Sequence, residues 1–208
     1  MLNRIKWLGH DTFLIDYEGK IVYIDPFNIT AEMPEADYIF VTHSHYDHFS
    51  KDDIKKIEKE NTVIIAPYDV INQIRNHKTV VAKIGEEIEL KDFKFKTVPA
   101  YNIDKYFHPK ANKWVGYILN IAGVKVYHSG DTDRIPEMQD MNVDIALLPV
   151  SGTYVMTAEE AAEAALDIKP DVAIPMHYGS IIGSKSDAER FAELLKDKIQ
   201  VKIFDIGL

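Results

Sequence analysis

His43-Ser44-His45-Tyr46-Asp47-His48 is the stretch of this 208-residue chain that says most about its fold and chemistry. It follows an apolar run at residues 38–41 and precedes a helix that we expect to begin near Ser50. In an extended chain His43 and His45, two residues apart, face the same side. Three imidazoles and one carboxylate suit Zn, Mn, Fe or Ni. A solvated polar loop is the alternative, but three of the eight histidines fall here, so we interpret the stretch as a metal site.

Other apolar runs also end in polar residues of metal-binding type. Residues 21–24 lead into Asp25, residues 124–127 into a turn with Asp131, and residues 172–175 into His177. A sheet-based enzyme presents functional side chains in this way, with rigid strands behind and loops at one edge. The chain has no cysteine, so its metal ligands must come from His and Asp.

The order of these motifs resembles the metallo-β-lactamase superfamily of metal-dependent hydrolases. Residues 43–48 are similar to its His-x-His-x-Asp-His motif, Asp131 to its bridging aspartate and His177 to its last histidine. The resemblance is greater to the branch that includes ascorbate-6-phosphate lactonase. The segments that carry it are 8–10, 25–27, 128–132, 146–150 and 175–178. They span nearly the whole chain and are specific for fold and metal rather than for substrate.

Periodicity predicts many short strands and few helices, which favours two packed sheets with helices outside. The expected strands are residues 2–8, 12–17, 20–25, 37–42, 62–66, 79–84, 93–99, 114–121, 124–128, 144–149, 171–175 and 199–203. The expected helices begin after Ser50, cover 68–76 and 157–168, and open at Ser186 with Glu189. The resemblance implies an α/β, four-layer αβ/βα sandwich (the metallo-β-lactamase fold). It would form one domain over residues 1–208, with two pseudo-symmetric halves that meet near residue 90.

The resemblance also implies two divalent metal ions, with zinc favoured and Mn, Fe or Ni as alternatives. Metal 1 would take His43 and His45, metal 2 would take Asp47, His48 and His177, and Asp131 would bridge them. Such ions activate a shared hydroxide and polarise the scissile oxygen. Asp47 would also be catalytic, because it could accept a proton from the attacking water or deliver one to the leaving group.

The chain departs from the superfamily pattern at metal 1. Relatives carry a third histidine after a Pro-Ala-aromatic strand end, where this chain has Asn102, a poor ligand for a zinc-type ion. The next histidine, His108, precedes Pro109, which biases His108 towards an extended conformation. We expect His108 to complete metal 1 or to contact its water or the substrate, which would make it a catalytic residue. An exposed histidine on a mobile loop is the alternative, and the second ion stays open.

Six further side chains are candidates for contacts with a ligand or the substrate. Asn102 is one of them, and it also stays an alternative to His108 as the third ligand of metal 1. Asp25 would orient a ligand histidine, unless it is only a turn aspartate before proline. His10 is either an active-site residue or a buried structural histidine. His128 would support the site, contact substrate or pack in the core. Tyr154 and Tyr178 would border the pocket, or serve as packing aromatics.

Composition narrows the function. The formal net charge of −9 argues against broad affinity for nucleic acid. No apolar run reaches membrane-span length and the N-terminal residues are too polar for a signal peptide, so we expect a cytoplasmic protein without a membrane partner. The leading hypothesis is a metal-dependent hydrolase of a small, anionic phosphoester or lactone. A nuclease or phosphodiesterase and a non-hydrolytic metal-binding or redox domain are the alternatives, and homo-oligomerisation stays open.

Overall fold

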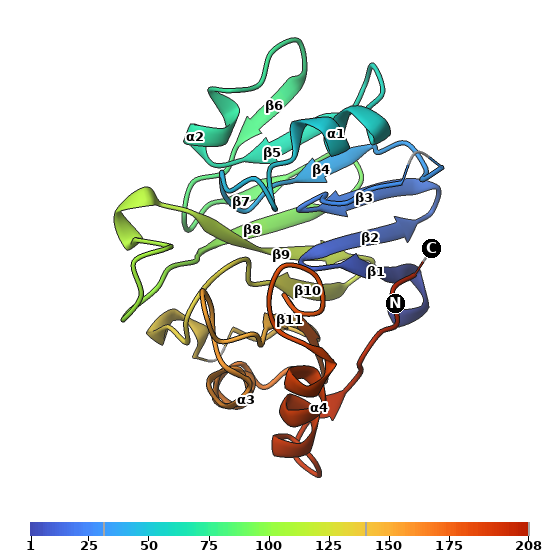
Figure 1. The fold of residues 1–208 in the computed structure, drawn as a ribbon. Coiled ribbons are helices and arrows are strands. Elements are labelled where there is room, and N and C mark those ends of the chain that lie inside the picture. Colours follow the sequence, from blue (N-terminus) through green and yellow to red (C-terminus); the bar gives the residue numbers. More distant parts are fainter. Residues whose placement is uncertain (31, 140, 208) are drawn as a thin grey trace. The chain divides into compact units, whose positions relative to one another are not determined.

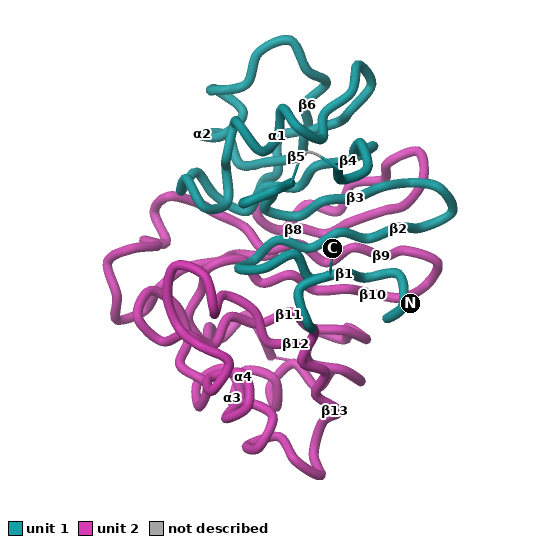
Figure 2. The backbone as a smooth tube through the Cα atoms, turned by 45° about the vertical axis from the view of Figure 1, so that its right-hand side comes forward, with its two compact units in different colours: residues 1–83, 205–208 teal, residues 84–204 magenta. Residues whose placement is uncertain are grey.

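The computed structural model describes residues 1–30, 32–139 and 141–207 (Figure 1). The chain divides into two compact units, coloured separately in Figure 2. Unit 1 is Met1–Lys83 with Asp205–Leu208, and unit 2 is Ile84–Phe204. Each unit contains one mixed β-sheet and helices, so the predicted α/β class is confirmed. The single domain with halves meeting near residue 90 stays a prediction.

Unit 1 contains a six-stranded sheet in the order β1-β2-β3-β4-β5-β6. The first three strands pair antiparallel, and β3 to β6 pair parallel. The carboxyl ends of β1, β3, β4 and β5 therefore share one edge of this sheet. The strands are β1 Ile5–Gly9, β2 Thr12–Tyr17, β3 Lys20–Ile24, β4 Tyr38–Phe40, β5 Val63–Ala66 and β6 Lys78–Val81.

Two α-helices and a short 3-10 helix complete unit 1: α1 Lys51–Ile57, α2 Tyr68–Ile71 and η1 Leu2–Arg4. The Ser50 hydroxyl accepts a hydrogen bond from the Asp53 N–H and so caps α1 as predicted. Ile54 and Ile57 of α1 belong to the apolar cluster that covers one face of the sheet. The helix expected over residues 68–76 ends at Ile71, because the N–H groups of Gln73 and Ile74 bond to carbonyls three residues back instead of four. Asn76 then takes a left-handed conformation just before β6.

Unit 2 contains a seven-stranded sheet in the order β13-β12-β11-β10-β9-β8-β7. Strands β7 to β10 pair antiparallel and β10 to β13 parallel, so β8, β10, β11 and β12 end at one edge. We did not predict β7, whose sequence Glu-Ile-Glu is short and charged. The strands are β7 Glu87–Glu89, β8 Lys94–Pro99, β9 Val115–Ile121, β10 Val124–His128, β11 Ile145–Pro149, β12 Val172–Met176 and β13 Gln200–Val201.

The helices of unit 2 are α3 Ala158–Ile168 and α4 Lys185–Leu194, with 3-10 helices η2 Lys110–Asn112 and η3 Pro136–Met138. Helix α3 lies against β11 and α4, and α4 also lies against β12 (Figure 1). The capping box predicted at Thr157 and Glu160 is confirmed. The predicted start of α4 at Ser186 is wrong. The Asp187 carboxylate accepts from the N–H of Ser184, which makes Ser184 the N-cap.

Asp53 connects α1 to the loop that follows β3. Its carboxylate accepts hydrogen bonds from the N–H groups of Asn28 and Ile29 and from Lys56 Nζ, at 2.9, 3.0 and 2.8 Å. Burial raises the pKa of this carboxyl, but hydrogen bonds from Lys56, Ser50 and the Asn28 N–H outweigh that effect and hold the pKa below its ordinary value. The ionised form therefore stabilises the loop.

We predict that Asp53→Ala lowers the free energy of unfolding by about 1–3 kcal/mol at pH 7, because the N–H groups of Asn28 and the buried Ile29 lose their acceptor. A depressed pKa in the folded state gives stability that is present above the unfolded value, about 3.9, and lost as pH falls through the folded value. Urea unfolding of metal-free protein at pH 7 and pH 3 would measure the free energy of unfolding of both proteins. The difference between wild type and Asp53→Ala should be smaller at pH 3 than at pH 7. An equal difference between wild type and variant at both pH values would contradict the prediction.

Candidate metal centre

The histidine-rich stretch of unit 1 forms a turn after β4. The His45 carbonyl accepts from the N–H groups of His48 and Phe49, at 3.1 and 2.8 Å. Strand β4 ends at Phe40, so His43 and His45 lie beyond the regular strand. Their rings nevertheless meet, with His43 Nε2 3.0 Å from His45 Nδ1. The His43 ring also lies 4.0 Å from that of His48, centroid to centroid. The three imidazoles therefore form one cluster within unit 1.

A fully buried carboxylate, Asp25, organises this cluster from the end of β3. Its Oδ1 accepts from the N–H of Thr42 at 2.7 Å, and its Oδ2 accepts from the Thr42 hydroxyl at 2.6 Å. The same Oδ2 lies 2.8 Å from Nδ1 of His48. A buried carboxylate is costly unless it is well hydrogen-bonded, and these contacts meet that demand while fixing the His48 ring.

The hydrogen bonds around Asp25 determine the proton positions on two imidazoles. The Thr42 hydroxyl donates to Asp25, so the Thr42 oxygen accepts the Nδ1 proton of His43, 2.9 Å away. His48 donates its own Nδ1 proton to Asp25. A neutral imidazole carries one proton, so Nε2 of both rings keeps its lone pair. Ligand histidines in metal sites are oriented by contacts of this kind.

His10, in the link between β1 and β2, belongs to the same edge of the sheet. It is buried, and its Nε2 lies 3.0 Å from Oδ2 of Asp47. The same Asp47 oxygen lies 3.8 Å from Nε2 of His48. The structure thus places His10 against a candidate ligand and candidate proton carrier, and His10 can hold the Asp47 carboxylate in place.

The donor set of unit 1 fits a zinc-type ion. Two nitrogens bound tetrahedrally to Zn at about 2.0–2.1 Å lie about 3.3 Å apart, and His43 Nε2 and His45 Nδ1 are 3.0 Å apart. Ligand-type atoms of Asp25, His43 and His48 also lie within 4.8 Å of one another. Asp25 already holds Thr42 and His48, so its part is to orient ligands, and the imidazoles supply the lone pairs.

Unit 2 brings a second set of candidate residues together around Asp131, which follows β10. Asp131 Oδ2 lies 3.1 Å from Nε2 of His108 and 3.2 Å from Nε2 of His177. All three side chains are buried. One carboxylate oxygen that faces two imidazole nitrogens is the chemistry expected of residues that surround a cation.

Two polar side chains orient these histidines. Asn102 Oδ1 accepts from the backbone N–H of His108 at 2.9 Å and lies 3.1 Å from its Nδ1. Ser151 Oγ lies 2.8 Å from Nδ1 of His177. Both rings therefore turn Nε2 towards Asp131. Asn102 positions His108 in this arrangement, while His108 presents the imidazole nitrogen that Asn102 lacks.

The remaining predicted residues of unit 2 make packing and turn contacts. His128 is fully buried, and its Nδ1 accepts from the N–H of Gly130 in the turn that leads to Asp131. The Tyr154 carbonyl accepts from Asn102 Nδ2, and Tyr178 is buried. His128 thus supports the segment that carries Asp131, and Tyr154 braces Asn102.

Three site residues have a left-handed backbone, which non-glycine residues seldom adopt. The φ angles are 51° at His10, 46° at Asp25 and 60° at His177. Each residue directly follows a strand, where the chain must turn sharply to aim the side chain along the sheet edge. Such conformations concentrate at functional sites, where surrounding contacts hold them.

Sequence reasoning missed three residues that hold the candidate ligands. Thr42 connects His43 to Asp25, Ser151 contacts His177, and Asp133 accepts from Asn102 Nδ2 at 3.1 Å. Thr42 directly precedes His43, and Ser151 follows the apolar run that forms β11. Their places in the sequence were therefore the one indication that they contact the site. Single Ser, Thr and Asp residues at strand ends are too common for that signal to be specific.

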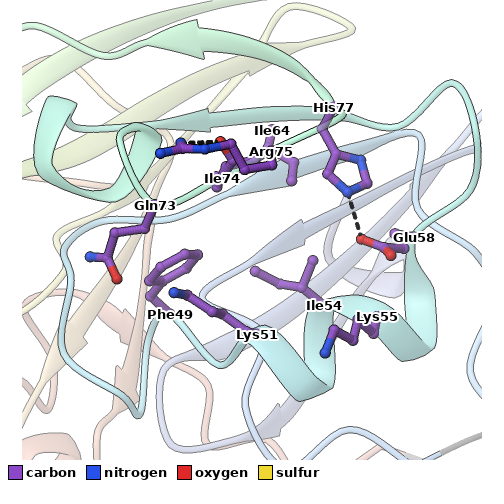
Figure 3. A pocket seen from close by; sticks show the side chains of 10 residues that line it. All are labelled: Phe49, Lys51, Ile54, Lys55, Glu58, Ile64, Gln73, Ile74, Arg75 and His77. Carbon is purple, nitrogen blue, oxygen red and sulfur yellow. Dashed lines mark hydrogen bonds and ion pairs between the residues drawn. The ribbon is translucent and has the colours of Figure 1, made fainter.

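A pocket of about 140 Å³ in unit 1 lies apart from these ligands (Figure 3). Phe49 and Ile54 are among the apolar residues that line it. His77 also lines it, and Figure 3 shows its ring paired with Glu58, at 3.0 Å. Among the described residues that line this pocket there is no candidate metal ligand, so His77 does not belong to the candidate metal centre.

Comparison with known proteins identifies the family. Residues 4–177 match the family described as “Beta-lactamase superfamily domain”. UPF0173 metal-dependent hydrolases of Thermococcus kodakarensis and Thermococcus onnurineus are 35% and 33% identical, over 98% of this chain and 97% of their own. A solved metal-dependent hydrolase from Parabacteroides distasonis is 34% identical, with a TM-score of 0.86 over 98% of this chain and 93% of that one.

The chain belongs to the metallo-β-lactamase superfamily of metal-dependent hydrolases. The predicted fold and enzyme class are therefore confirmed. The similarity to the ascorbate-6-phosphate lactonase branch stays a prediction. Among the residues that the structure describes, no helix has the length and apolar character needed to cross a membrane.

We predict that Asp25→Ala lowers zinc affinity about 10- to 100-fold, because His48 and Thr42 lose the partner that orients them. Competition with a chromogenic chelator would measure the affinity. Asp37→Ala is the matched control, since Asp37 accepts from the Ile21 N–H in the same sheet but contacts none of the histidines in the described contacts. Equal zinc affinity in wild type and Asp25→Ala would contradict the assigned role.

Proposed function

We propose that this protein hydrolyses a small anionic ester, a phosphoester or a lactone, with the help of divalent metal ions. The observation that carries the proposal is that each unit gathers imidazoles and a carboxylate at the carboxyl edge of its own sheet. In both sets, other polar side chains hold Nδ1 of ligand-type histidines, at Asp25 in unit 1 and at Asn102 and Ser151 in unit 2. Histidine rings that are oriented in advance by such contacts are typical of metal sites, and they are not needed for stability alone.

The proposed ligands follow the superfamily resemblance. They are His43, His45, Asp47 and His48 of unit 1 and Asp131 and His177 of unit 2, with His108 completing the set in place of the histidine that Asn102 replaces. Zinc is the metal we propose, and Mn, Fe and Ni accept the same donors. Bound ions of this kind lower the pKa of a water molecule and polarise the ester oxygen.

Residues of the chain itself would transfer the proton and hold the group that carries it. Asp47 is the one candidate ligand of unit 1 that can exchange a proton as a carboxylate, and we assign it the proton of the attacking water or of the leaving group. His10 holds Asp47 at 3.0 Å and so fixes where that proton is received. Burial of Asp25, His43 and His48 limits the water that reaches their hydrogen bonds.

A small substrate is favoured over nucleic acid. Lys105, Lys110 and Lys113, which flank His108 in the sequence, are the residues that would supply a basic surface for nucleic acid. Lys105 Nζ lies 2.6 Å from Asp133, and Lys110 Nζ lies 3.1 Å from Glu137. Two of the three lysines are therefore neutralised by partners, which weakens any attraction to phosphate backbones. A cytoplasmic location stays part of the proposal and rests on composition alone.

A substrate panel tests the proposal. Chelator-treated protein would be reloaded with zinc and given bis(4-nitrophenyl) phosphate, a lactone, a thioester, a β-lactam and supercoiled DNA. We expect turnover of the phosphodiester or the lactone that disappears with the chelator and returns with metal. Absence of metal-dependent turnover on every substrate would overturn the proposal, and cleavage of DNA alone would favour a nuclease.

We predict that His48→Ala and His177→Ala deplete the same metal ion, because both residues are assigned to metal 2. We also predict that Asp131→Asn weakens the binding of both ions and abolishes turnover. Asn keeps the shape of Asp but removes the charge that offsets the cations. Metal analysis and anomalous scattering would identify the ion lost in each variant. Loss of different ions in the two histidine variants would overturn the assignment.

A further inference from the structure

The loop between Asn102 and His108 exposes an unusual group of apolar side chains, Ile103, Tyr106 and Phe107, here called the aromatic lip. Their exposed fractions are 55%, 96% and 47%. In the described part of the chain nine large apolar side chains are exposed, and three of them fall within these five positions. Single exposed apolar residues are ordinary, whereas clusters mark surfaces that bind something.

The base of this loop is fixed by hydrogen bonds. The Asn102 N–H donates to the His108 carbonyl at 2.7 Å, and the His108 N–H donates to Asn102 Oδ1 at 2.9 Å. The Ile103 N–H donates to Asp133 Oδ2 at 2.8 Å. The loop thus closes on itself, and these hydrogen bonds order its base. A surface that is ordered before binding loses less entropy when a ligand arrives.

The positive charge of the loop is turned away from its tip. Lys105 Nζ lies 2.6 Å from Asp133 Oδ1, and its side chain is only 20% exposed. Asp104 is left as an exposed charge beside the aromatic lip. A loop that docks on an anionic membrane or on nucleic acid would present its lysine outwards. The pairing of Lys105 therefore favours an apolar group as the occupant.

The aromatic lip is built on the segments that carry candidate metal ligands of unit 2. Phe107 directly precedes His108, whose Nε2 faces Asp131. The Phe107 ring packs edge-on against Tyr154, with centroids 4.7 Å apart and planes at 84°. The Tyr154 carbonyl in turn accepts from Asn102. Rings placed in this way offer edges and faces to a further aromatic ring.

We infer that the aromatic lip binds an aromatic group of the substrate, so that the substrate is an aryl-bearing phosphoester or lactone. The inference rests on the proposed function, because it assumes that the ester is bound by metal near His108. Tyr106 and Phe107 are specificity residues in this account, and they take no part in bond breaking. The aryl group contributes binding free energy through apolar burial and ring contacts.

Two non-hydrolysable ligands with the same head group test the inference. Calorimetry on zinc-loaded protein would compare phenylphosphonate with methylphosphonate. We expect phenylphosphonate to bind at least about tenfold tighter to the wild type, in line with burial of one ring. In Tyr106→Ala and in the Tyr106→Ala, Phe107→Ala double variant that preference should fall to about twofold or less, with methylphosphonate affinity unchanged. Tyr68→Ala, which removes a 68%-exposed tyrosine in unit 1, is the matched control.

The outcomes separate the inference from the proposed function. Equal affinity of the wild type for the two phosphonates, or a preference for phenylphosphonate that survives in the double variant, would overturn the inference about the aromatic lip. The proposed function would be unaffected by either result. Failure of both phosphonates to bind, together with no metal-dependent turnover, would overturn the proposed function and the inference with it. If the wild type binds vesicles and Tyr106→Ala does not, the aromatic lip binds a membrane instead. If the wild type dimerises without ligand and Tyr106→Ala does not, the aromatic lip binds a second copy of the chain instead. Tyr106 is 96% exposed, so we expect Tyr106→Ala to fold as the wild type does.

Discussion

The contact between the buried Asp25 carboxylate and Nδ1 of His48 is the constraint on which the candidate centre of unit 1 depends. It fixes the ring and the proton of His48, and through Thr42 it does the same for His43. The contact exists because β3 and β4 pair parallel and end at the same edge of the sheet. The fold of unit 1 thus determines which imidazole nitrogens carry lone pairs.

In unit 2 the candidate histidines are also oriented by contacts at Nδ1, but different side chains make these contacts. Asn102 and Ser151 contact Nδ1 of His108 and His177, and both rings turn Nε2 to Asp131. The groups that orient these rings are a neutral amide and a hydroxyl, so Asp131 is the carboxylate that faces both Nε2 atoms. Where the superfamily resemblance predicts a histidine the chain has Asn102, and Asn102 positions the histidine six residues later.

Much of the fold followed from the sequence, because strand ends and caps have local signals. Thr157 with Glu160 and Ser50 marked the starts of α3 and α1. The start of α4 was misplaced, since Ser184 and Ser186 both precede an acidic residue three positions on and only the backbone conformation selects between them. Strand β7 was missed because Glu87–Glu89 owes its pairing to β8 rather than to its own composition.

The candidate ligands were visible for the same local reason, as histidines and aspartates at the ends of apolar runs. Their supporting residues were not, because Thr42 and Ser151 acquire their roles only when strands distant in sequence pair. The proximity of His108 to Asp131 could be expected from Pro109 and the strand at either end of the loop. The part of Asn102 in positioning His108 required the folded loop, which bends back until Asn102 Oδ1 meets the His108 N–H.

The protonation pattern of the unit 1 histidines tests the central claim most directly. Long-range ¹H–¹⁵N correlation spectra of the zinc-loaded protein report which ring nitrogen of each imidazole carries a proton. The structure predicts a protonated Nδ1 and a metal-bound Nε2 for His43 and His48, and a metal-bound Nδ1 for His45, whose Nδ1 faces His43. A metal-bound or unprotonated Nδ1 on His48 would contradict the account, because Asp25 would then not set its orientation.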